Sequence, residues 1–162
     1  MMQKKLLYFL LLFALACSPK ANTSETGMPL PVNVIEKIEQ RYPSKEDKNG
    51  APKKAVYIDT TSKEIISEKY FYESGKVYIE QNFKSGLKNG TAIAYRDTTG
   101  TPWSLHTYVN DTLNGPYKTW HPNGGLMMEG QYEMGKKAGS WRFFDPSGGV
   151  TKIINFSDSI PD

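Results

Sequence analysis

From about residue 65 onward, apolar and polar residues alternate in short runs separated by turn residues. Leu126, Met128 and Tyr132, for example, fall on one side of an extended chain, because successive side chains of a strand point to opposite faces. Turn residues such as Asn123-Gly124 stand between the runs and readily adopt positive φ. The pattern therefore predicts a succession of β-hairpins.

The predicted hairpins repeat every 24 or 25 residues, and three sets of positions recur at that spacing. In the first set an aromatic residue is followed by a turn glycine: Phe71/Gly75, Tyr95/Gly100, Trp120/Gly124 and Phe144/Gly148. The second pairs an aromatic with a turn residue three positions later: Phe83/Gly86, Tyr108/Asp111, Tyr132/Gly135 and Phe156/Ser159. The third consists of Gly90, Gly115 and Gly139. A single hairpin cannot bury its apolar face, so we expect a mainly β fold in which the hairpins form one antiparallel meander.

The chain before the repeats has a different pattern. Apolar residues at Val34, Ile35, Ile38 and Tyr42 fit one face of a short N-terminal helix ended by Pro43. We therefore assign 32–54 to a short helix and a polar loop. The β-hairpin repeat domain is expected over 55–162, with clear repeats over about 65–159.

The first residues are typical of a secretory signal peptide. Lys4 and Lys5 precede an apolar run over 6–16 that is too short for a mature membrane span. Cys17 follows, and the composition then becomes polar and rich in Ser, Pro, Asn and Thr. We therefore expect a signal peptide over 1–16 and a flexible tether over 17–31.

The segment Ala14-Leu15-Ala16-Cys17 resembles the bacterial lipobox, in which a cysteine is acylated before cleavage. It departs at Ala14, where Leu is usual. The alternative is an ordinary cut after Ala-x-Ala, which would leave a free thiol at the new N-terminus. Cys17 is the only cysteine, so no intramolecular disulfide can form. We expect lipid, including palmitate, on Cys17 and a lipid-anchored protein of the cell envelope. Ser18 follows Cys17, where an Asp would signal retention in the inner membrane. We therefore expect the protein in the outer membrane if the source has two membranes.

Charge and motif content argue against several functional classes. The formal net charge of +3 falls to +1 without Lys4 and Lys5, so charge gives no case for nucleic-acid binding. His106 and His121 lack zinc-ligand spacing, and no phosphate-binding loop occurs. Ser104 and His106 would share a strand face without an orienting acid. We therefore expect no cofactor, no metal and no enzymatic activity.

Three aromatic residues are candidates for contacts with a partner. Tyr95 and Trp120 recur at one position of successive hairpins, where they could equally be cross-strand packing residues. Trp103 has no repeat equivalent, and it lies in the unit whose turn, 97–100, is one residue longer. Departures from a repeat are where function is often inserted, so Trp103 is the leading candidate.

The repeats resemble the MORN-repeat variant family, an aromatic-x-x-x-Gly hairpin repeat common in bacterial lipoproteins. The matching pieces are Tyr72-Glu73-Ser74-Gly75-Lys76, Trp120-His121-Pro122-Asn123-Gly124 and Phe144-Asp145-Pro146-Ser147-Gly148. The second unit departs from the family, since Asp111 stands where a glycine is usual. Many members are labelled antitoxins of the YwqK type, which fits a secreted, lipidated form poorly.

These features together favour a non-enzymatic, membrane-anchored lipoprotein whose β-repeat sheet binds a protein or an envelope polymer. One alternative is an antitoxin-like or immunity-like protein that binds a toxin. Another is an envelope glycan hydrolase that would use paired carboxylates such as Glu129 and Glu133, provided that they converge in a cleft.

Overall fold

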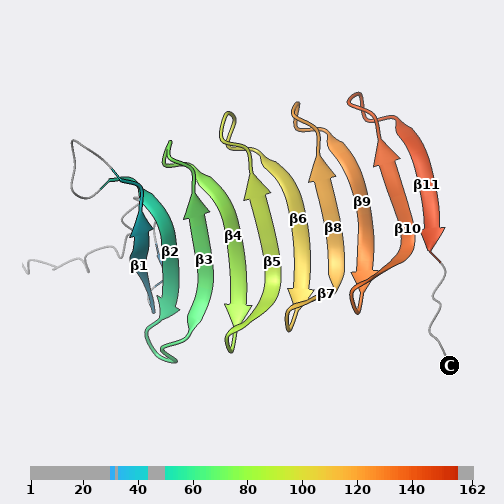
Figure 1. Ribbon diagram of the computed structural model, residues 1–162. Helices are drawn as coiled ribbons and strands as arrows, with labels where there is room; N and C mark the ends of the chain where they lie inside the picture. Colours follow the sequence, from blue (N-terminus) through green and yellow to red (C-terminus); the bar gives the residue numbers. More distant parts are fainter. Residues whose placement is uncertain (1–29, 32, 44–49, 157–162) are drawn as a thin grey trace, which may run out of the picture.

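A computed structural model describes residues 30–31, 33–43 and 50–156. The expected signal peptide, Cys17 and nearly all of the tether lie outside these residues. The described part forms one antiparallel sheet whose strands follow each other in chain order (Figure 1). The strands are β1 (Val34–Arg41), β2 (Pro52–Asp59), β3 (Ile65–Phe71), β4 (Val77–Lys84), β5 (Leu87–Tyr95), β6 (Pro102–Val109), β7 (Thr112–Leu113), β8 (Gly115–Trp120), β9 (Leu126–Glu133), β10 (Lys136–Phe144) and β11 (Val150–Phe156). The predicted hairpin meander is confirmed, and only the short β7 lies off the main path, paired with β6.

The helix predicted near residues 33–42 is wrong, because Val34–Arg41 form strand β1. β1 pairs antiparallel with β2, from Val34 opposite Asp59 to Arg41 opposite Pro52. Val34 is buried while Ile35 is 47% exposed, which is the alternation of a strand. Val34 and Ile38 are four residues apart, so they would lie on the same side of a helix and also on the same side of a strand. Their spacing therefore does not distinguish the two structures. Pairing with a neighbouring strand decides it, as tertiary context commonly overrides local pattern.

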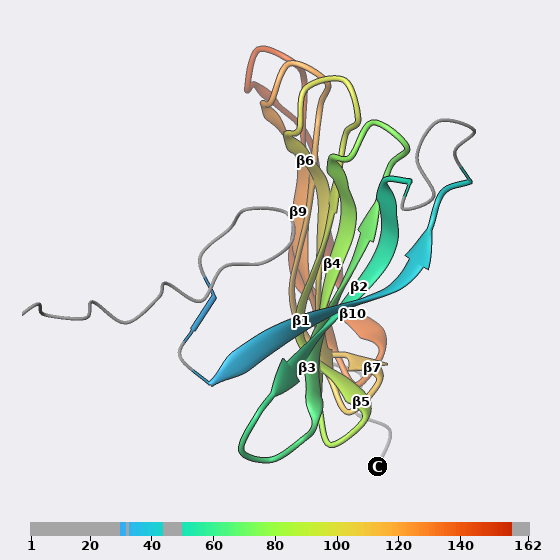
Figure 2. The same ribbon diagram turned by 90° about the vertical axis from the view of Figure 1, so that its left-hand side faces the viewer.

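The sheet is a single layer with two open faces over most of its length, and β1 crosses the later strands obliquely (Figure 2). Cross-strand partners share a face, so the pairing register assigns each side chain to a face. We call one side the aromatic face. It carries one aromatic residue near the end of each return strand: Phe83, Tyr108, Tyr132 and Phe156. The side chains of Lys118, Glu129 and Arg142 lie on the opposite face.

Two regions are well buried despite the single layer. Near β1, the side chains of Val34, Ala55, Tyr57 and Phe71 form a small core. On the aromatic face, Trp141 is fully buried, and its indole lies directly over the backbone of Gly130. A Cβ at Gly130 would lie 2.2 Å from the Trp141 ring, so glycine makes room for the indole.

Side-chain hydrogen bonds join successive hairpins at the residue just after an outgoing strand. Three of these residues follow a first-set aromatic, and the fourth follows β1. Tyr42, Tyr72, Arg96 and His121 each bond to the backbone carbonyl one hairpin further on, at 2.8, 2.9, 2.6 and 2.9 Å. The accepting carbonyls belong to Phe71, Tyr95, Trp120 and Phe144. We call this series the carbonyl ladder. His121 is therefore a member of the ladder, which gives this histidine a structural role.

The turns at the other end explain why Asp111 can replace a glycine. Asn110 and Asp111 both adopt positive φ, 47° and 64°, as a type I′ turn requires. The Asp111 carboxylate also accepts a hydrogen bond of 2.8 Å from the Lys88 backbone N–H in the neighbouring turn. Asp tolerates this conformation better than most residues, and here it adds a bond that glycine lacks.

Across the described ranges, no helix is long and apolar enough to cross a membrane.

Candidate binding groove

The aromatic face has a hollow where the repeat pattern of large side chains is interrupted. Two neighbouring outgoing strands place Tyr117 and Trp141 at the position that Ala92 occupies in β5. At the next position on the same face, Ala94 corresponds to Phe143 of β10. Alanine fills much less space than these rings, so an open groove of about 380 Å³ forms over β5.

The groove has apolar walls and a narrow floor. Tyr70, Ile79 and Phe83 line it from β3 and β4, and His106 and Tyr108 line it from β6. Its floor is formed by Ala92, Ala94 and Ser104, of which Ala94 and Ser104 are buried. Concave sites with mostly apolar walls and a few polar groups are where proteins commonly bind ligands.

His106 is the most informative polar residue in the groove. Its Nδ1 is buried and has no hydrogen-bond partner among the described residues. Burial lowers the pKa of His106, so the imidazole is neutral at pH 7. The ring stands edge-on to Tyr117, with centroids 4.9 Å apart, and runs nearly parallel to Tyr108 at 6.4 Å. These contacts hold a neutral ring whose Nδ1 is shielded from solvent and unpaired.

Two further side chains bring hydrogen-bonding capacity to the groove. Gln81 is buried, and its Nε2 donates to the Asn82 carbonyl at 2.8 Å. This bond orients the amide and leaves its oxygen for another donor. The Ser104 hydroxyl can both donate and accept. The groove thus combines aromatic walls with three uncharged polar side chains, and two charged side chains also line it.

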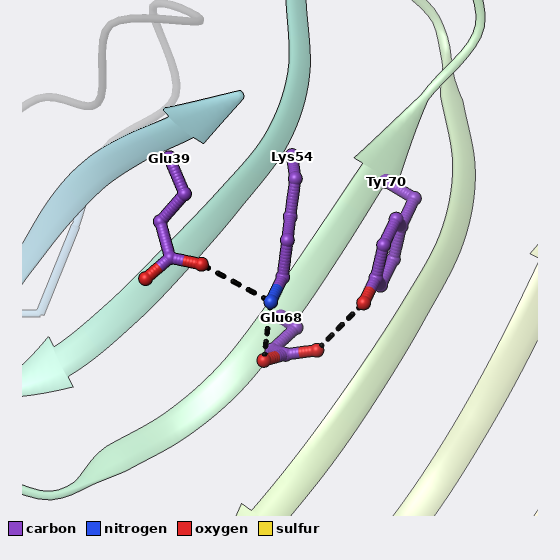
Figure 3. Close-up of polar contacts among 4 residues, drawn as sticks. All are labelled: Glu39, Lys54, Glu68 and Tyr70. Carbon is purple, nitrogen blue, oxygen red and sulfur yellow. Dashed lines mark hydrogen bonds and ion pairs between the residues drawn. The ribbon is translucent and has the colours of Figure 1, made fainter. Parts of the chain in front are cut away.

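The one carboxylate that lines the groove is held by other side chains (Figure 3). Lys54 Nζ lies 2.9 Å from Glu68 Oε1 and 3.1 Å from Glu39 Oε2. The Tyr70 hydroxyl donates to Glu68 Oε2 at 3.0 Å. The hydrogen bond to Glu68 raises the pKa of Lys54 above its usual range, so the ammonium stays charged. On the other side, Lys88 Nζ lies 5.3 Å from the centre of the Tyr108 ring.

The structure separates the three aromatics that the sequence singled out. Trp103 is 40% exposed on β6; it borders the groove and also a second hollow beside Tyr72 and Arg96. Tyr95 is half-buried and lines a different hollow with Phe71. Trp120, also half-buried, ends β8. Within residues 50–156 no ring contact joins any two of the three, and their role in binding stays a prediction.

The residues weighed for catalysis are placed as follows. Ser104 and His106 share the aromatic face, as their spacing predicts, and both line the groove. Glu129 lies on the opposite face, where it is 2.5 Å from Arg142 and 3.6 Å from Lys118. Glu133 lines the same shallow hollow as Glu129. In the part of the chain that the structure describes, no group of three or more His, Cys, Asp or Glu residues could hold a metal ion.

The groove was not found by sequence reasoning, although its signal was present. The outgoing strands already align Ala92 with Tyr117 and Trp141, and Ala94 with Thr119 and Phe143, in the sequence. Small residues in a column of aromatics imply missing volume, and missing volume on an open face implies a hollow.

Comparisons with known proteins identify the repeat. A family model described as MORN repeat variant matches residues 66–85 and 113–134, which cover the β3–β4 and β8–β9 hairpins. No curated protein matches the chain.

Among solved structures, a mutant of S. aureus TarM in complex with fondaparinux, alpha-GlcNAc-glycerol and UDP is 16% identical, with a TM-score of 0.33 over 77% of this chain and 20% of that chain. Another structure of TarM is 13% identical, with a TM-score of 0.31 over 75% of this chain and 19% of that one. This chain thus spans about a fifth of TarM, and TM-scores this low assign it neither a shared overall fold nor a function. The two matched hairpins agree with the recurring positions, so at least two hairpins of the chain match the MORN repeat variant model.

Proposed function

We propose that this chain is a membrane-anchored lipoprotein of the cell envelope that has no enzymatic activity and binds a protein or an envelope polymer through its repeat sheet. The single observation that carries the proposal is the groove on the aromatic face. It interrupts a row of large side chains and is lined by aromatic rings beside one unpaired polar atom, His106 Nδ1. Aromatic residues at the centre of an interface commonly supply most of the binding energy.

A binding role is also favoured over catalysis by the state of the candidate catalytic groups. His106 Nδ1 bonds to no carboxylate in the described ranges, whereas a Ser–His–acid arrangement needs one there. Glu129 is engaged by Arg142 and Lys118 on the opposite face, so its carboxylate oxygens already have partners. The repeats themselves are consistent with a surface for recognition.

The anchor is proposed from the sequence around Cys17. Acyl chains stabilise membrane attachment by about 0.8 kcal/mol per buried methylene group, so several chains hold a protein firmly. We expect Cys17→Ser to move the protein from the membrane pellet to the soluble fraction and to abolish palmitate labelling. If the variant still pellets and still takes up label, the anchor assignment is wrong.

The binding role can be tested by filling the groove. Ala92→Tyr places in β5 the residue that β8 carries at the equivalent position, Tyr117, so the sheet can accommodate it. Ser140→Tyr adds the same side chain at an exposed position of the opposite face and serves as the control. The full-length lipidated chain, cross-linked in envelope preparations, should lose its partner with Ala92→Tyr and keep it with Ser140→Tyr. An identical set of cross-linked components for the wild type and both variants would contradict the proposal.

A further inference from the structure

The groove also indicates what kind of ligand it accepts, and this inference rests on the proposed binding function. From its walls, its polar groups and its charge, we propose that the groove binds a neutral pyranose ring of an envelope glycan. The ring would lie over Ala92 and Ala94, between the side chains of β4 and those of β6. Three features of the groove support this assignment.

The first feature is the pairing of flat rings with a shallow floor. Tyr70 and Tyr108 stand on opposite sides of the groove, and the His106 ring runs nearly parallel to Tyr108. A pyranose has C–H groups on its faces and hydroxyl groups around its edge. Such C–H faces pack well on aromatic rings, which are apolar on their surface and carry a negative face. The 380 Å³ volume lies within the range of small-molecule sites.

The second feature is the set of neutral hydrogen-bonding groups around that space. Nδ1 of His106 is buried without a partner, and Gln81 and Ser104 present an amide oxygen and a hydroxyl. A purely apolar ligand would leave these groups buried and unpaired, which is costly. A ring with hydroxyl groups on several sides can bond to the Gln81 oxygen and the Ser104 hydroxyl, and to His106 Nδ1 once the groups that cover this atom move aside.

The third feature is the charge balance. Glu68, the carboxylate among the lining residues, is paired with Lys54, and Lys88 faces the Tyr108 ring. Lys88 has no carboxylate partner among the described residues, but a neutral ligand leaves its contact with the Tyr108 ring in place, and the groove offers no free carboxylate to an ammonium group.

The position of the groove within the sheet disfavours an extended peptide. β5 forms the floor and is paired with β4 on one side and β6 on the other. Its backbone N–H and C=O groups are used in these ladders, so a peptide could not add to the sheet there as it does at an exposed edge. A glycan needs no backbone pairing and can lie across the strands on the open face.

Titration calorimetry with three neutral hexasaccharides, cellohexaose, maltohexaose and chitohexaose, tests the assignment on the full-length chain in detergent. We expect saturable binding of at least one. Ala92→Tyr should weaken it at least tenfold by occupying the ring site, while Ser140→Tyr should leave it unchanged. His106→Phe keeps the ring but removes the nitrogen, so it should weaken binding about three- to tenfold. Circular dichroism confirms that each variant is folded.

The outcomes separate this inference from the proposed function. If none of the three glycans binds, or if Ala92→Tyr and Ser140→Tyr bind equally well, the sugar site is wrong. If Ala92→Tyr abolishes cross-linking in the envelope while no glycan binds, the binding function stands and the sugar assignment fails. Loss of the cross-linked partner after protease treatment of the envelope would likewise point to a protein ligand and refute the sugar assignment.

Discussion

Replacing Gly130 by alanine tests the packing of Trp141 on the sheet. Local backbone preference alone predicts that Gly130→Ala raises the free energy of unfolding, because glycine within a strand costs roughly 0.5–1 kcal/mol relative to alanine. Packing predicts the opposite. The new methyl group would lie 2.2 Å from Trp141 Cδ2 and 2.4 Å from Cε2, so the indole would have to move by about 1 Å.

The indole has little freedom to move. It is fully buried, its Nε1 donates to the Gln131 carbonyl at 3.2 Å, and its centroid lies 5.1 Å from that of Tyr132. Overpacking of this kind costs typically 1–3 kcal/mol, and complete loss of a buried tryptophan costs about 3–5 kcal/mol. We therefore expect a net loss of about 2–3 kcal/mol in the free energy of unfolding. For a sheet of this size, that is a fall in Tm of about 10 °C.

Thermal and urea unfolding, followed by circular dichroism, measure this loss. Gly125→Ala is the control, because Gly125 also has ordinary φ and its new Cβ would approach neighbouring atoms much less closely, Asn123 Oδ1 at 3.2 Å and the Pro146 carbonyl oxygen at 3.5 Å. The control should change stability by less than about 1 kcal/mol. In a double-mutant cycle, Trp141→Phe should relieve part of the cost of Gly130→Ala. An unchanged or higher Tm for Gly130→Ala would refute the packing argument.

Three smaller tests address other features. Tyr72→Phe removes the carbonyl-ladder bond to Tyr95 and should cost about 1 kcal/mol in urea unfolding, whereas an unchanged midpoint would show that the bond contributes nothing. The lowered pKa of His106 means that the unfolded chain binds the proton more readily. The stability that the protein gains by keeping His106 neutral is therefore complete above about pH 6.5 and is lost as the pH falls through the folded pKa. His106→Phe should make Tm depend less on pH in this range, and an unaltered profile would contradict the assignment. Asp111→Gly should stay near wild-type stability, while Asp111→Ala should cost about 1–2 kcal/mol because alanine is strained at φ 64° and cannot accept the Lys88 N–H; equal Tm values for the two variants would be inconsistent with this role.

The repeat architecture could be predicted because its signal is redundant. Each hairpin supplies an aromatic, a turn glycine and an alternating strand, and four copies agree. The β1 segment has no such support. Val34 and Ile38 are compatible with either secondary structure, and only pairing with β2 makes this segment a strand.

The site was harder to predict, for two physical reasons. The carbonyl ladder uses tyrosine, arginine and histidine at one structural position, and they share only the reach of a donor to the next hairpin, which a comparison of residue types does not reveal. The groove is defined by absent volume at Ala92 and Ala94. Sequence reasoning favours conspicuous residues such as Trp103, while a hollow is made by the least conspicuous ones.

Because each hairpin pairs only with the hairpins before and after it, the order of strands in space copies their order in the chain. Duplicating one unit of the gene would therefore add two strands, or about 10 Å of sheet, without rethreading any connection. The same property lets each hairpin dock on its predecessor as it leaves the ribosome, with no need to wait for distant sequence. A protein built in this way can change its span across evolution in steps of one hairpin, while a pair of alanines in a single unit decides where along that span the groove lies.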